Sequence, residues 1–83
     1  MAEKFEVGEK EKHIITVKTS LISKFITIEM DGESLIRDWH PSPFAKTFHF
    51  NVGSSENHHV ELRVGPFTAA KVLVDGRPVQ PLL

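Results

Sequence analysis

Apolar and polar residues alternate with a period of two along most of this chain. Four clear stretches cover residues 13–18, 24–30, 46–52 and 58–64, where β-branched, aromatic or other apolar side chains occupy every second position. This alternation is typical of β-strands that bury one face. No spacing of apolar residues at i, i+3 and i+4 persists for ten residues, so the pattern predicts an all-β protein.

Two Asp-Gly pairs, at residues 31–32 and 75–76, predict tight hairpins. A type I′ turn needs positive φ at both central residues, and this dipeptide tolerates it well. The return strands are expected at residues 33–37 and 77–80. Because Pro78 cannot donate to a sheet ladder, the second return strand should be an edge strand or leave the sheet quickly.

The chain also contains an internal repeat. Residues 5–17 recur as residues 50–62, with Phe, Val, Gly, Glu and His at matching places, and the Asp-Gly pairs recur at almost the same separation. In this alignment Leu35 matches Val79 on the apolar face. Each half, residues 5–44 and 48–83, therefore reads as strand, turn, strand, loop, strand, Asp-Gly, strand.

One antiparallel sheet of this kind would leave an apolar face in water, whereas two such sheets packed face to face share a core. We therefore predict a single domain over residues 1–83. Its expected fold is an antiparallel β-sandwich of about seven or eight short strands, built from two pseudo-twofold related halves. The pattern leaves open whether strands are exchanged between the two sheets.

Composition narrows the classes of partner. The net charge is −1, and lysines alternate with glutamates near the start of the chain, so a nucleic acid or anionic membrane held by charge is not expected. The absence of cysteine removes disulfides, thiolate zinc sites and a cysteine nucleophile. No secretory signal and no apolar run near the ~18 residues of a membrane span are visible, so we expect a cytoplasmic protein.

A family resemblance emerges from the order of these motifs. Asp31-Gly32 is followed by Trp39, then by a Phe-x-Phe-x-Val-Gly run at residues 48–53, and finally by Asp75-Gly76. This order resembles one β-sandwich domain of the Fas apoptotic inhibitory molecule family. The resemblance covers residues 12–80 and implies a non-enzymatic, cytosolic domain that acts through protein contacts, with an anti-apoptotic role in animals.

Histidines are the conspicuous polar residues. His13 and His58 are related by the repeat and fall at the first inward position of their strands. They are candidates for a metal-binding or pH-responsive pair. We favour a structural alternative, in which each ring bonds a backbone carbonyl at the rim of the core. His49 is expected to point outward, and the adjacent His58 and His59 should point to opposite faces of one strand.

No motif of a catalytic nucleophile, phosphate loop or zinc protease is present, so we expect neither an enzyme nor a cofactor. The irregular segment 38–45 carries the candidate interaction residues Trp39, His40 and Phe44, since loops and large aromatic side chains often form interfaces. The alternative, which we favour from the sequence, is that Trp39 and Phe44 fold back to cover one open end of the core.

The leading functional hypothesis is a non-enzymatic β-sandwich module that acts through protein–protein interaction with an unknown protein partner. The alternative is a small-ligand or metal-binding β-sandwich that uses histidines. A weak homodimer through an exposed edge strand is a further expectation, because unpaired strand edges can pair with one another.

Overall fold

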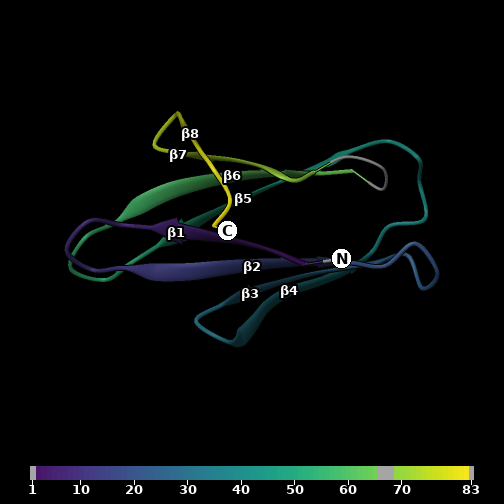
Figure 1. Ribbon diagram of the computed structural model, residues 1–83, viewed down its shortest axis with the longest axis horizontal. Helices are drawn as coiled ribbons and strands as arrows, with labels where there is room; N and C mark the ends of the chain where they lie inside the picture. Colours follow the sequence, from purple (N-terminus) through teal and green to yellow (C-terminus); the bar gives the residue numbers. More distant parts are fainter. Residues whose placement is uncertain (1, 66–68, 83) are drawn as a thin grey trace.

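A computed structural model describes residues 2–65 and 69–82 (Figure 1). Its described part contains eight strands and no helix. None of the described residues forms a helix with the length and hydropathy needed to cross a bilayer. The strands are β1 (Ala2–Val7), β2 (His13–Thr19), β3 (Phe25–Met30), β4 (Glu33–Trp39), β5 (Lys46–Val52), β6 (His58–Val64), β7 (Lys71–Val74) and β8 (Arg77–Val79).

The strands form two antiparallel sheets in the orders β1-β2-β3-β4 and β5-β6-β7-β8. Each sheet is one half of the repeat, so no strand is exchanged between the sheets. The two sheets lie one over the other as the layers of a sandwich (Figure 1). The predicted all-β sandwich built from two related halves is confirmed.

Both sheets contribute to one apolar core. Alternate residues of β2 and β6, such as Ile15 and Leu62, are fully buried. Burying a side chain of this size stabilises a fold by about 1.5–3 kcal/mol. The buried core comprises Phe5, Val7, Ile15, Val17, Ile26, Ile28, Val52, Val60, Leu62, Val64, Ala70 and Val72. In the sequence, Gly65-Pro66 predicts the end of the strand after Val64, and Pro66 lies outside the described residues.

The two Asp-Gly hairpins form as predicted. Asp31 and Gly32 have φ of 52° and 86°, and Asp75 and Gly76 have φ of 51° and 81°. Positive φ at both central residues is the signature of a type I′ turn, whose twist matches that of the flanking strands. The return strand β8 contains Pro78 and is an edge of its sheet, as expected.

A β-bulge in the first half corrects the predicted position of Leu35. Ile28 pairs with Ile36 and Glu29 pairs with Ser34, so Leu35 is the extra residue of the bulge. Its side chain is 44% exposed, whereas Ile36 packs against the core. Ile36 is therefore the counterpart of Val79, because an inserted residue reverses the faces of the residues that follow it.

The structure also corrects the predicted position of Trp39. Strand β4 continues to Trp39, which pairs with Phe25, while Asp38 pairs with the buried Ile26. Neighbouring residues of a strand point to opposite faces, so Trp39 lies on the outer face of the sheet. Trp39 is 61% exposed and Phe44 is 77% exposed. The expectation that these two aromatic residues cover the end of the core is wrong.

The four edge strands differ in what limits further pairing. The β1 edge is contacted by the chain's last described segment, through a hydrogen bond from Leu82 N–H to the Lys4 carbonyl (2.7 Å). Strand β4 carries the bulge, and β8 has only three residues including Pro78. Strand β5 pairs with β6 over all seven residues without a bulge. Its outer edge is therefore the most regular strand edge of the described chain.

Candidate functional site

The β1–β2 turn (residues 8–12) and the β5–β6 turn (residues 53–57) lie side by side at one end of the sandwich (Figure 1). Each turn receives a carboxylate from the other. The Glu11 carboxylate accepts hydrogen bonds from the backbone N–H groups of Ser54 (2.7 Å) and Ser55 (3.0 Å). The Glu56 carboxylate accepts from those of Glu9 (2.6 Å) and Lys10 (3.0 Å). We call this reciprocal arrangement the turn exchange.

A histidine supports each carboxylate of the turn exchange. His13 donates from Nε2 to Glu11 (2.7 Å) and from Nδ1 to Asp31 (2.6 Å). His58 donates from Nε2 to Glu56 (2.7 Å) and from Nδ1 to Asp75 (2.6 Å). An imidazole that donates from both nitrogens is protonated. Both nitrogens of His13 and of His58 thus bind carboxylates. The prediction that each ring bonds a backbone carbonyl is wrong.

The hairpin aspartates do more than provide turn geometry. The second carboxylate oxygen of Asp31 accepts from the Ile14 N–H (2.8 Å), and that of Asp75 accepts from the His59 N–H (2.9 Å). Each aspartate thus ties its Asp-Gly hairpin to the start of the strand that carries the histidine. The result is a continuous chain of contacts in each half, from hairpin through imidazole to the opposite half's turn.

These contacts shift the pKa values of the groups involved. Hydrogen bonds to Glu11 and Asp31 raise the pKa of His13, and those to Asp75 and Glu56 raise the pKa of His58. Donation by His13 and by Ser55 holds the pKa of Glu11 far below its ordinary range. Backbone donation from Glu9, together with His58, lowers the pKa of Glu56 to about 2. All four shifts favour the charged pairs.

The side chains at this end form hydrogen bonds that hold the two turns together. The hydroxyls of Ser54 and Ser55 donate to Glu11 Oε1 (3.0 and 2.7 Å), and neither has a hydrogen bond to an imidazole. With both ring nitrogens of His13 and His58 donating, neither ring has a lone pair for a proton or a metal ion. Within residues 2–65 and 69–82, no cluster of three or more His, Asp or Glu side chains could hold a metal ion.

The sequence contained a signal for this network. A Glu-x-His triplet followed by an Asp-Gly pair occurs in both halves, at Glu11 and His13 and again at Glu56 and His58. The repeat therefore marks the residues that interact. It does not show that each glutamate reaches the turn of the other half, because that contact depends on how the two sheets pack.

We expect the domain to be most stable between about pH 4.5 and pH 6.5, the ordinary pKa values of Glu and His. The raised pKa of His13 and His58 means that their contribution is complete below pH 6.5 and is lost as the pH rises through the folded-state pKa. The lowered pKa of Glu11 and Glu56 means that their contribution is complete above pH 4.5 and is lost as the pH falls.

Thermal unfolding followed by circular dichroism across this range tests the prediction. The double variant His13→Gln/His58→Gln should lose the alkaline decline in melting temperature and keep an acid decline. An unchanged alkaline decline in that variant would show that other groups cause it.

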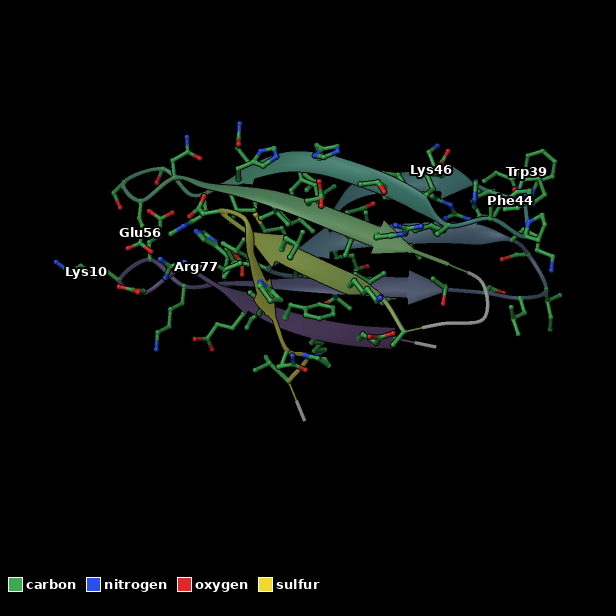
Figure 2. All side chains as sticks on the ribbon, turned by 90° about the horizontal axis from the view of Figure 1, so that it is seen from above. Lys10, Trp39, Phe44, Lys46, Glu56 and Arg77 are labelled. Carbon is green, nitrogen blue, oxygen red and sulfur yellow. The ribbon has the colours of Figure 1, made fainter. Side chains whose placement is uncertain are left out.

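The opposite end of the sandwich exposes large apolar side chains. Among the described residues, Leu21 is 53% exposed, Ile22 95%, Trp39 61% and Phe44 77%. Trp39 and Phe44 project together at the end far from Lys10 and Glu56 (Figure 2). The β2–β3 loop, which carries Leu21 and Ile22, reaches the same end (Figure 1). We call these four residues the apolar end.

His40 joins the two loops of the apolar end. Its backbone N–H donates to the Lys24 carbonyl (2.8 Å), and its Nε2 donates to the Phe44 carbonyl (2.7 Å). The structure therefore brings together the predicted residues Trp39, His40 and Phe44, with His40 as a half-buried support and the two aromatic residues exposed. Leu21 and Ile22 were not predicted, because their loop lies nearly twenty residues away in the sequence.

Comparison with protein-family models, with curated proteins and with solved structures found no match to this chain. Its function is therefore inferred from the geometry and chemistry of the two ends of the sandwich.

Proposed function

We propose that this domain is a non-enzymatic β-sandwich module that binds another protein through the apolar end. The observation that carries the proposal is the exposure of four large apolar side chains at one end, with Ile22 95% and Phe44 77% exposed. Contiguous exposed apolar surface on a small domain is typical of interaction sites. Trp and Phe are also efficient anchors of protein interfaces.

The surface fits a protein better than a small molecule. A pocket beside the apolar end, lined by Leu21, Phe25 and His40 among others, holds only about 20 Å³. This is room for about one water molecule. Ligand pockets usually have volumes of about 300–1,000 Å³. An end with exposed, projecting side chains instead suits insertion into a groove on a partner.

Charge around the apolar end indicates the kind of partner. Arg37 stacks over the Phe25 ring, with its guanidinium carbon 4.4 Å from the ring centroid. Lys24 lies in the adjoining loop, and Lys46 pairs with Asp38. Within two residues of the four apolar side chains, the chain thus carries three cations and one carboxylate. We propose a partner with an apolar groove and an acidic rim, because complementary charge speeds and orients association.

Two expectations from the sequence join this proposal. The resemblance to the Fas apoptotic inhibitory molecule family agrees with a non-enzymatic domain acting through protein contacts. A cytoplasmic location agrees with a chain that has no cysteine and needs no disulfide. For weak self-association we propose the outer edge of β5, the most regular of the four strand edges.

The test uses the double variant Trp39→Ala/Phe44→Ala, because both side chains are exposed and their loss should leave the core intact. Quantitative crosslinking and affinity capture should recover a defined partner with wild type, and the variant should bind it on the order of 30-fold more weakly. Leu35→Ala is the matched control, since Leu35 is exposed but lies outside the apolar end.

Equal loss of binding in Leu35→Ala would contradict the assignment of the surface. Binding of the wild type to lipid vesicles, abolished in the double variant, would assign the apolar end to a membrane and overturn the proposal. Sedimentation that shows a dimer dependent on Trp39 would assign it to a second copy of this chain.

A further inference from the structure

The outer face of the β5–β8 sheet holds two imidazoles side by side. His49 on β5 pairs in register with Glu61, and His59 on β6 pairs with Asn51, so the two histidines are diagonal neighbours. Their ring centroids are 5.5 Å apart and their planes differ by 19°. His49 Nδ1 and His59 Nε2 are separated by 3.4 Å. Both residues are exposed, on the face of the sheet that points away from the core.

This separation is that of two ligands on one zinc ion. With zinc–nitrogen bonds of about 2.0–2.1 Å and tetrahedral geometry, two nitrogens lie about 3.4 Å apart. The rings are stacked, so their lone pairs lie in nearly parallel planes. An exposed histidine can turn about its side-chain bonds at small energetic cost, which lets both nitrogens point at one ion.

The neighbours of the pair favour a ligand role. His59 Nδ1 lies 3.4 Å from Asn51 Oδ1, so Nδ1–H can donate to the amide oxygen and leave Nε2 with its lone pair beside His49 Nδ1. Such a bond to the second ring nitrogen is the usual way in which proteins orient a metal-binding histidine. Glu61 Oε1 lies 3.8 Å from His49 Nδ1 and adds negative charge beside the pair.

We propose that His49 and His59 form a two-imidazole binding site for zinc on the outer face of the β5–β8 sheet. His49 binds through Nδ1 and carries its proton on Nε2, and His59 binds through Nε2. Water fills the remaining positions, with Glu61 beside the ion. Because the described residues provide no cluster of three ligands, this is an open site and binds zinc more weakly than a closed structural site.

This site differs from the pair expected from the sequence. His13 and His58 have both ring nitrogens engaged by carboxylates, whereas the pair on the outer face has nitrogens free of carboxylate hydrogen bonds. Only the antiparallel register of β5 and β6 brings His49 next to His59.

Titration of the full chain with zinc chloride, followed by NMR of the imidazole resonances, tests the proposal. We expect the signals of His49 and His59 to shift first and together, while those of His13, His40 and His58 stay in place. By calorimetry, His49→Ala and His59→Ala should each weaken zinc binding by roughly 10–100-fold. Thr47→Ala, an exposed change on the same strand, is the matched control and should bind as wild type.

The melting temperatures of the variants should equal that of the wild type, since changes on an exposed sheet face should leave the fold intact. This measurement separates a loss of zinc binding from a loss of folding. Zinc binding of undiminished affinity in either histidine variant would overturn the site, as would first shifts at His40. The variant Trp39→Ala/Phe44→Ala should bind zinc normally, so this test is independent of the proposed protein interaction.

Discussion

The substitution Gly53→Ala is expected to lower the melting temperature by on the order of 10 °C or more, or to prevent folding. Gly53 has φ of +106°, and an added Cβ would lie 1.8 Å from the carbonyl oxygen of Glu56 and 3.0 Å from Glu11 Oε2. The first of these atoms belongs to the backbone and cannot move aside alone. The β5–β6 turn would have to open, and the carboxylate of Glu11 would lose the N–H groups it binds there.

Gly76→Ala is the matched control. Gly76 has φ of +81°, and a Cβ there would meet no heavy atom within 4 Å. This variant carries only the strain of a left-handed residue, about 1–2 kcal/mol, which corresponds to roughly 4–16 °C for a domain of this size. Thermal unfolding should rank Gly53→Ala clearly below Gly76→Ala. Equal losses would contradict a close approach at Gly53.

We expect Glu11→Gln to lower the melting temperature by roughly 5–10 °C near pH 6. The carboxylate accepts hydrogen bonds from His13 (2.7 Å), from Ser54 N–H (2.7 Å) and from Ser55 N–H (3.0 Å). The neutral amide of the introduced glutamine makes these hydrogen bonds weaker, because they are no longer charge-assisted. Its NH₂ group also faces N–H donors and cannot accept from them. The hydrogen bonds that residue 11 accepts from the opposite half are then weakened, while those that Glu56 accepts remain.

Hydrogen exchange gives this prediction a sharper readout. Glu11→Gln should reduce protection of the Ser54 and Ser55 amides, whereas Glu56→Gln should reduce protection of the Glu9 and Lys10 amides. Each change would thus appear in the half that was not mutated. Glu9→Gln is the matched control, since its exposed side chain lies in the same turn. Loss of protection confined to the mutated half would disprove the exchange.

The turn exchange and the apolar end give the two ends of the sandwich different properties. One end is held by charged hydrogen bonds between the halves, and the other presents apolar side chains on two loops and on the last residue of β4 (Figure 2). A rigid scaffold that positions exposed residues is the usual basis of recognition by loops. We therefore expect the turn exchange to keep the two sheets rigid, and these sheets position the residues of the apolar end.

The main local features could be predicted from the sequence, with two instructive exceptions. The alternation of Ile15 with its neighbours gave the correct buried face, and each Asp-Gly pair gave the correct turn. Leu35 was placed on the wrong face because a bulge leaves no trace in a periodic pattern. Trp39 was expected to cover the core because size favours burial, whereas its place in the strand directs it outward.

By itself, the sequence determined the strands, the buried face of most of them and the twofold repetition of the same unit. These follow from periodicity and turn chemistry, which act between near neighbours in the chain. Only the tertiary structure decided that Glu11 binds the turn at Ser54, that His49 lies beside His59, and that the apolar end is exposed. Each of these depends on distances between segments far apart in the sequence, which are set by the packing and register of whole sheets. The repeat marks the glutamate and histidine residues of the turn exchange, and the packing of the two sheets decides which backbone groups the glutamates bind.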